Sequence, residues 1–319
     1  MASRLIVGCG YVGMRVAKRW LQNGDTVFAI TRSEARSGEL SQYGIHPIVW
    51  DWLVGGLPSV NQPMQTLSEL RLERTPFATI LVSVSHAVQP DLPPDETHTR
   101  GLNHFASVLE SMGWFSDSKL TQTKWIYLST TGVFGPPSSH VALPVLRQRS
   151  SGWVDEDSPV CPARPGSIAA LAGERWLESH VSKDLRVALR PAGIYGPNRV
   201  PRWQSIRDNT PLQVDPASYL NLIQVDDLAS IVVSVSLAKM QHSLYCVSDG
   251  EPVRRKEYYE FISKLGNWPE PVFSTSDSGA TGSSGDKRVR SDRIMTELAI
   301  QLMYPSYRDG LKSLLMDFL

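Results

Sequence analysis

Three glycines near the start of the chain have the spacing of a phosphate-binding turn. Gly8, Gly10 and Gly13, with Tyr11 and Val12 between them, form a GxGxxG sequence after an apolar run and before an amphipathic stretch. The first glycine of such a turn permits a tight bend, the second leaves room for a pyrophosphate, and the third lets a helix pack on a strand. The N–H groups at the start of that helix then attract the diphosphate. The context favours a dinucleotide site over the alternative, a plain glycine turn.

The tip of the second predicted strand distinguishes between two dinucleotides. An NAD site usually has an acidic residue there, which accepts a hydrogen bond from the ribose 2′-hydroxyl. This chain has Thr31, Arg32 and Ser33 at that point. The guanidinium of Arg32 suits a 2′-phosphate, since arginine binds phosphate through charge-assisted hydrogen bonds. The sequence therefore predicts NADP(H), with NAD as the alternative cofactor and a solvated surface position as the alternative for Arg32.

Strand-like and helix-like segments alternate around these residues. The apolar patterning predicts strands at 4–7, 26–30, 45–50, 79–84, 124–128, 185–189 and 243–247, and helices at 11–21, 102–112, 168–181 and 226–238. Such alternation indicates an α/β protein of the Rossmann class, with a doubly wound parallel sheet. We expect residues 1–190 to form the dinucleotide-binding core. Residues 191–319 are expected to complete the sheet and to form a smaller substrate-side lobe, with a mobile loop at 273–286 that is rich in serine and glycine.

The composition excludes several classes of protein. Lysine and arginine number 32 and aspartate and glutamate also number 32, so no net charge favours nucleic acid or an anionic membrane. The three cysteines are widely separated, and the histidines show no ligand spacing, so neither disulfides nor a metal site is expected. Neither a secretory leader nor a membrane span is evident. These features predict a cytoplasmic protein with a small-molecule substrate; its oligomeric state stays open, with a dimer among the alternatives.

Several segments resemble those of a known family. Residues 129–135 (STTGVFG) are similar to its SSxxVYG segment, and residues 190–197 (RPAGIYGP) to its RPxxVYGP segment. Residues 221–229 (NLIQVDDLA) and 245–249 (YCVSD) are similar to its IHVDDLA and YNVSD stretches. On these motifs the chain resembles the extended short-chain dehydrogenases/reductases of the NAD-dependent epimerase/dehydratase group, many of which act on nucleotide sugars.

The resemblance implies roles for single residues. Asp51, after the third predicted strand, corresponds to the aspartate that meets the adenine amine, and Ser83 lies at a cofactor-binding position. Pro191 corresponds to the residue that lies against the nicotinamide. Thr130 corresponds to the catalytic Ser/Thr.

Two further positions are assigned to the substrate on the same basis. Thr131 follows the catalytic position, and Arg288 matches a residue that faces a nucleotide-sugar phosphate in relatives. A surface salt bridge is the alternative role for Arg288.

The chain departs from this family at its catalytic dyad. The family uses YxxxK, often followed by xxxE, on the helix after the fifth strand; alignment on Glu174 places Gly166 and Ala170 at the tyrosine and lysine positions. No tyrosine lies between Tyr127 and Tyr195, and no lysine between Lys124 and Lys183. The reaction of the family therefore lacks its usual acid and base in this chain.

Other groups could replace the missing acid. His86 follows the fourth predicted strand, and residues 155–157 (Asp155, Glu156 and Asp157) precede the helix that lacks the dyad; a solvated loop histidine and a solvated acidic cap are the alternatives.

Two functions fit the sequence. One is an atypical NAD(P)-dependent oxidoreductase or epimerase that acts on a nucleotide-sugar-like substrate. The other is a catalytically silent NADP(H)-binding protein that senses redox state or regulates a partner.

Overall fold

The computed structural model describes residues 1–54, 77–85, 91–111, 123–135, 152–274 and 286–314. The chain divides into two compact units that interleave along the sequence. The first unit comprises residues 1–129, 165–189 and 229–244, and the second comprises residues 130–164, 190–228 and 245–319.

The first unit is built on a parallel sheet. Its elements are β1 (Ser3–Val7), α1 (Gly13–Gln22), β2 (Thr26–Thr31), α2 (Glu34–Gln42), β3 (His46–Val49), β4 (Thr79–Val82), α4 (Pro94–Ser111), β5 (Lys124–Leu128), α5 (Pro165–His180), η4 (Lys183–Leu185), β7 (Arg186–Pro191), α7 (Val225–Leu237) and β11 (Leu244–Val247). The unit boundary falls within β7, α7 and β11. The seven strands have the order β11-β7-β5-β4-β1-β2-β3, and each pairing from β3 to β7 is parallel.

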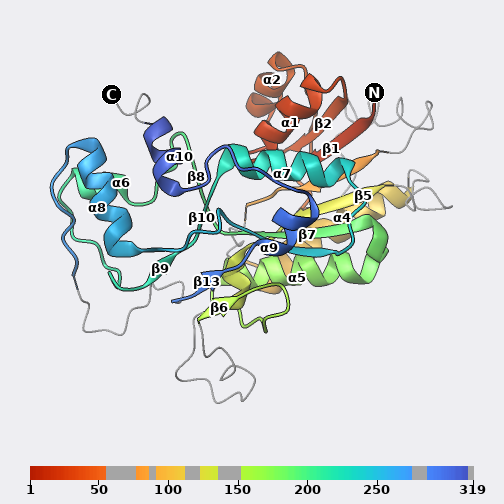
Figure 1. Ribbon diagram of the computed structural model, residues 1–319. Coiled ribbons are helices and arrows are strands. Elements are labelled where there is room, and N and C mark those ends of the chain that lie inside the picture. The colour runs from red at the N-terminus through yellow and green to blue at the C-terminus, as the bar shows by residue number, and fades with distance from the viewer. Residues whose placement is uncertain (55–76, 86–90, 112–122, 136–151, 275–285, 315–319) are drawn as a thin grey trace. The chain divides into compact units, whose positions relative to one another are not determined.

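Helices cover both faces of this sheet (Figure 1). On one face α1 lies beside α7, and the indole of Trp20 donates a 3.2 Å hydrogen bond to the Ser236 hydroxyl. On the other face α4 and α5 pack together. Because side chains alternate along a strand, Leu5 and Val7 join the core beneath α4 and α5, while Ile6 lies against Gly13 of α1.

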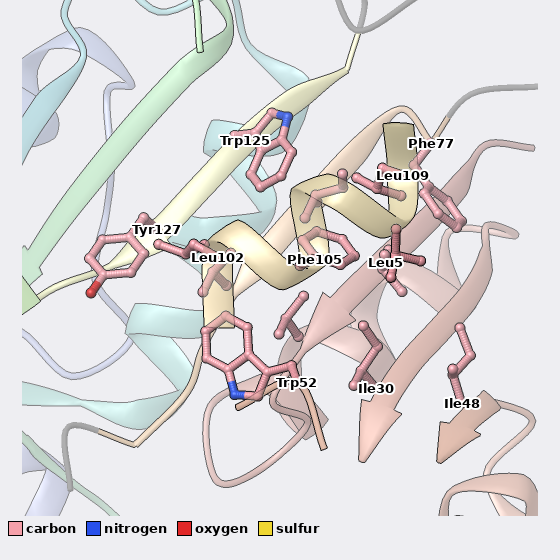
Figure 2. Packing of buried hydrophobic residues seen from close by; sticks show 14 of the residues in the cluster. Leu5, Ile30, Ile48, Trp52, Phe77, Leu102, Phe105, Leu109, Trp125 and Tyr127 are labelled. Carbon is pink, nitrogen blue, oxygen red and sulfur yellow. The ribbon is translucent and has the colours of Figure 1, made fainter. Parts of the chain in front are cut away.

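The core beneath α4 and α5 is rich in aromatic rings. Figure 2 shows Phe105 of α4 between Trp125 of β5 and the aliphatic side chains of β1 and β2. The rings of Phe105 and Trp125 are 5.7 Å apart and edge to face, and Trp125 is 6.0 Å from Trp176 of α5. Edge-to-face rings contribute about 0.5–1.5 kcal/mol beyond the area they bury. These contacts fix α4 and α5 on the sheet.

The second unit has its own core. Its elements are η2 (Thr131–Phe134), β6 (Trp153–Val154), β8 (Gly193–Tyr195), α6 (Trp203–Arg207), β9 (Tyr219–Leu220), β10 (Leu222–Gln224), β12 (Val253–Arg254), α8 (Arg255–Gly266), β13 (Arg288–Val289), α9 (Asp292–Glu297) and α10 (Tyr307–Ser313). Three two-stranded sheets pair β10 with β8, β12 with β9 and β13 with β6. Tyr195, Tyr258 and Tyr307 are fully buried at the centre of its apolar cluster.

The predicted α/β class and doubly wound sheet are confirmed, and each predicted strand and helix of the first unit is present. The sequence did not reveal α2, because among its residues Leu40 alone is buried and the helix shows little apolar periodicity. The predicted division at residue 190 coincides with one crossing between the units, but 130–164 belongs to the second unit and 229–244 to the first. The predicted loop at 273–286 falls largely on residues 275–285, outside the described residues.

Gly173 of α5 leads to a stability prediction. A Cβ atom at this position would lie 2.2 Å from the Tyr127 hydroxyl oxygen and 2.4 Å from the ring carbon that carries it. Gly173→Ala should therefore lower the free energy of unfolding by about 1–3 kcal/mol, as overpacked cores do. Urea unfolding followed by circular dichroism measures this change.

The matched control is Gly38→Ala on α2. Gly38 is exposed, and an added Cβ meets nothing within 4 Å. In that helix interior alanine should raise the unfolding free energy by about 0.5–1 kcal/mol. Equal effects at the two positions would contradict the packing shown for Tyr127.

Candidate functional site

The glycine turn after β1 brings two backbone segments into direct contact. Gly8 has φ +89°, and a Cβ there would lie 2.8 Å from the carbonyl oxygen of Ser83, just beyond β4. A Cβ on Gly13 would lie 2.8 Å from the Gly8 oxygen, while one on Gly10 meets nothing within 4 Å. Gly8 and Gly13 are thus required by the fold, whereas Gly10 leaves open space where a ligand can approach.

Helix α1 begins at this turn without a side-chain cap. Its N-cap is Val12, which makes no side-chain capping bond, and its first turn holds no acidic residue. The Met14 and Arg15 N–H groups bond to the Gly10 and Val12 carbonyls, and the start of a helix carries partial positive charge. Arg15 lies 4.4 Å over the Tyr11 ring and donates a 2.8 Å hydrogen bond to the Tyr11 carbonyl. The helix start therefore suits an anion.

A cavity of about 320 Å³ opens beside this turn, at the carboxyl ends of β1, β2 and β4. Strand order reverses here, with β2 on one side of β1 and β4 on the other, and open α/β sheets bind ligands at such a point. The walls come from the glycine turn, the strand tips and α4: Val7, Gly8, Cys9, Gly10, Ile30, Thr31, Arg32, Arg36, Trp50, Trp52, Leu53, Ser83, Val84, Ser85, Thr97 and His98.

Two arginines form the basic end of this cavity. Arg32 is exposed and makes no hydrogen bond or ion pair with any described residue. Arg36, which the sequence analysis did not identify, donates a 3.0 Å bond to the Cys9 carbonyl and lies 2.5 Å from the Glu39 carboxylate. Ser33 is occupied, because its hydroxyl accepts from the Arg36 N–H and caps α2. Burial raises the pKa of the Cys9 thiol to about 12, so this cysteine stays protonated and is a poor nucleophile.

Two indoles line the cavity on either side in sequence of Asp51, the residue expected to contact adenine. Trp50 and Trp52 are buried, and Trp52 packs on Gly101 of α4, where a Cβ would lie 2.5 Å from its ring. Asp51 lies between them, and its carboxylate accepts a 3.1 Å bond from the Leu53 N–H. Asp51 does not itself line the cavity, and its predicted contact with adenine stays a prediction.

A buried histidine on α4 also lines the cavity. The Nδ1 atom of His98 is 2.6 Å from the Tyr127 hydroxyl, and its Nε2 atom is 3.1 Å from the Ser85 carbonyl oxygen. Burial, and then the charge of Glu174, raise the pKa of the Tyr127 hydroxyl well above its ordinary value. The sequence analysis did not identify His98, and the histidine that it considered, His86, lies outside the described residues.

Helix α5 carries neither tyrosine nor lysine. Ala170 is fully buried, and Gly166 is the second residue of the helix. The Glu174 carboxylate accepts a hydrogen bond from the buried Ser129 hydroxyl, so these two polar groups of the first unit satisfy each other.

The remaining predicted site residues belong to the second unit. The Thr130 hydroxyl accepts a 3.0 Å bond from the Gly132 N–H and caps η2, while Thr131 and Pro191 are buried. The structure therefore gathers Gly8, Gly10, Arg32 and Ser83 around one cavity, with Tyr11, Val12 and Gly13 in the adjoining turn and helix start. The roles expected for Thr130, Thr131, Pro191 and Arg288 remain predictions.

The acidic turn at 155–157 is engaged in local contacts of the second unit. Asp155 accepts a 2.8 Å bond from the Ser158 hydroxyl, and Asp157 pairs with Arg293 at 2.6 Å. The buried Glu156 accepts a 2.7 Å bond from the backbone N–H of Cys246, and burial raises the pKa of its carboxyl. These contacts engage all three carboxylates within the second unit, and the Glu156 side chain is only 4% exposed, so the alternative of a solvated cap does not describe this residue.

Arg288 lies in a cluster of alternating guanidinium groups and rings, the arginine–aromatic cluster. Its guanidinium is 4.9 Å from the Trp153 ring and 5.1 Å from the Tyr219 ring. Arg254 lies 4.0 Å over Tyr219, and Arg290 lies 5.4 Å over Trp153. No carboxylate of the described residues pairs with Arg254 or Arg290, so the cluster offers positive charge to an anion.

Backbone contacts hold this cluster in place. Strand β13 pairs in parallel with β6, which sets Arg288 opposite Trp153. The Asn221 side chain bonds to the Lys287 carbonyl at 2.8 Å and to the Val289 N–H at 2.7 Å.

Two kinds of feature are absent from the described residues. Within them, no three His, Cys, Asp or Glu side chains are grouped as metal ligands. No helix there is both long and apolar enough to span a membrane.

Comparisons with known proteins show the fold. No protein-family model and no curated protein sequence matches the chain. Among solved structures, a functionally unknown conserved protein from Silicibacter pomeroyi matches with a TM-score of 0.71 at 24% identity, over 100% of this chain and 99% of that one. A dTDP-glucose 4,6-dehydratase from Bacillus anthracis, in complex with NAD, has a TM-score of 0.73 at 14% identity, over 100% and 96%. The UDP-glucose 4-epimerase of Thermotoga maritima, with UDP-glucose, has a TM-score of 0.72 at 15% identity, over 99% and 98%.

The likeness extends over whole chains. This chain has the Rossmann-like fold of NAD-dependent sugar epimerases and dehydratases, as the sequence motifs predicted.

Gly10 provides a test of the glycine turn. Gly10→Val should abolish dinucleotide binding while the protein stays folded, because the added atoms enter open space in the protein but block a pyrophosphate. Titration with NADPH, followed by its fluorescence, measures binding, and circular dichroism confirms folding. Gly38→Val on α2 is the control and should bind normally. Full affinity in a folded Gly10→Val protein would place the cofactor elsewhere.

Proposed function

We propose that this protein is a cytoplasmic NADP(H)-binding member of the epimerase/dehydratase group with an atypical active site. The observation that carries the proposal is one cavity with a glycine turn on one wall, next to an uncapped helix start, and two arginines on another wall. The turn suits a pyrophosphate, and the arginines suit a further phosphate.

The basic end of the cavity supports NADP(H) over NAD(H). Arg32 has no partner among the described residues, so its guanidinium can bind an incoming phosphate without breaking a protein contact. Arg36, whose guanidinium is already paired with Glu39, joins α2 to the glycine turn through the Cys9 carbonyl. An NAD site would be expected to have a carboxylate at the strand tip.

The hydrogen bonds of the polar groups around α5 support the proposal that hydride transfer is slow. A bound nicotinamide supplies hydride transfer, which in this fold needs a partner that donates or accepts a proton. Ser129 and Glu174 are bonded to each other, and Thr130, a very weak acid, caps η2 and could only orient a substrate oxygen. The same observations favour the second candidate, a catalytically silent NADP(H)-binding redox sensor or regulator.

The arginine–aromatic cluster supports a phosphorylated substrate. Arg254, Arg288 and Arg290 alternate with two rings, which hold the guanidinium groups in place by cation–π contact. Three ordered guanidinium groups suit a diphosphate, and a UDP-glucose 4-epimerase of this fold has been solved with UDP-glucose. We therefore propose a nucleotide-sugar-like substrate, with Arg288 on its phosphates and Thr131 among the groups that contact it.

Cofactor choice is tested by affinity. NADPH should bind about 10- to 100-fold more tightly than NADH, because a hydrogen bond to a charged group contributes about 1.5–3 kcal/mol. Arg32→Ala should remove most of this difference, whereas Arg207→Ala, at an exposed arginine paired with Asp208, should not. Fluorescence titration with both cofactors measures the ratio. Equal affinities in the unchanged protein would refute the assignment of NADP(H).

Reactivity is tested by single-turnover absorbance of bound NADPH with a panel of nucleotide sugars and small carbonyl compounds. We expect very slow or no hydride transfer, because a positioned acid or base contributes about 10²–10⁴-fold to a rate and the tyrosine–lysine dyad is missing. Any turnover should depend on His86 or on one of the acids at 155–157. Rapid turnover that survives substitution of all four residues would contradict this prediction.

A further inference from the structure

His98 has no role in the function proposed above, although its ring is buried in the wall of the cavity. The side chain lies on α4 and is 1% exposed, and both ring nitrogens have partners. A polar group buried at this depth is costly to leave unpaired, so its hydrogen bonds fix the tautomer.

The partners determine which nitrogen carries the proton. The Ser85 carbonyl can only accept, so the Nε2 atom of His98 is the donor of that 3.1 Å bond. In the neutral ring Nδ1 is then free of hydrogen and accepts the hydroxyl proton of Tyr127 at 2.6 Å. Burial raises the pKa of Tyr127 well above its ordinary value, which keeps that hydroxyl protonated and therefore a donor.

Tyr127 is itself held by two elements. Its backbone lies in β5, in register with Val82 of β4. Its hydroxyl lies over Gly173 of α5, where any side chain would collide with it. The hydroxyl therefore gives His98 a fixed anchor.

The bond to Ser85 reaches the cofactor turn through the backbone. Ser85 lies two residues beyond Ser83, whose N–H donates a 2.8 Å bond to the Val7 carbonyl of β1. A Cβ on Gly8 would lie 2.8 Å from the Ser83 oxygen and 3.0 Å from the Val84 Cα, so the segment 83–84 is the surface on which the turn rests.

We propose that His98 is a positioning residue of the dinucleotide site, which holds the segment 83–85 beneath the glycine turn through its bond to Ser85. The inference rests on the proposed cofactor function for its effect on affinity, but the ordering of the turn can be measured without any ligand. Tyr127 contributes indirectly, because its hydroxyl holds the imidazole of His98 in place.

Two conservative variants separate this role from a general contribution to stability. The amide nitrogen of His98→Gln can take the place of Nε2 and keep the bond to Ser85, but it loses the Tyr127 contact. The amide of His98→Asn can take the place of Nδ1 and keep the Tyr127 contact, but it cannot reach Ser85. Both lose one buried hydrogen bond, so both should lower the thermal midpoint by a similar amount.

The expected results differ between these variants. His98→Asn should bind both NADPH and NADH about fivefold more weakly, which corresponds to one hydrogen bond, with their ratio unchanged. His98→Gln should keep the affinity of the unchanged protein. Binding is followed by quenching of tryptophan fluorescence, since Trp50 and Trp52 line the cavity.

Hydrogen exchange of the ligand-free protein provides the second measurement. Amides of residues 7–14 and 79–85 should exchange faster in His98→Asn than in His98→Gln, while those of the arginine–aromatic cluster should be equal in both. If the unchanged protein bound no dinucleotide, the proposed function would fail while this exchange difference would still support the positioning role. The positioning role would be overturned if the two variants had the same dinucleotide affinity and the same exchange rates, whether unchanged or changed by the same amount.

Discussion

The first unit depends on the direct contact between the glycine turn and the backbone just beyond β4. At Gly8 the two segments are so close that no side chain can lie between them. This contact places the start of α1 at the carboxyl ends of β1, β2 and β4, where the strand order reverses. The position of the helix start beside the cavity follows from it, because a displaced turn would aim the N–H groups of α1 away from the cavity.

The groups proposed for binding differ in their contacts from the polar groups near α5. The basic end of the cavity is open, with Arg32 exposed and available to an anion. The polar groups near α5 are hydrogen-bonded to one another: Ser129 bonds to Glu174, and Tyr127 bonds to His98. Leaving a buried polar group unpaired costs about 1–3 kcal/mol, so groups satisfied in this way favour order over proton transfer.

The two units offer different chemistry to an anion. In the proposed function, the first would bind a phosphate through backbone N–H groups at a helix start. The second would bind an anion through the arginine–aromatic cluster, in which rings hold guanidinium groups that would otherwise sample many rotamers. Its acidic turn is occupied elsewhere, because Asp157 pairs with Arg293 and Glu156 binds the Cys246 N–H.

The sequence by itself determined the fold class, the central strands and the glycine turn, because these depend on local periodicity and on the absence of a side chain at Gly8 and Gly13. It failed at α2, where one buried leucine gives too weak a pattern. Only the tertiary structure decided which side chains surround the cavity. It placed His98 of α4 in the cavity wall, and it added Arg36 to Arg32. Such partners lie far apart in the chain or on unpredicted elements, and residue spacing carries no information about which side chains meet across a sheet.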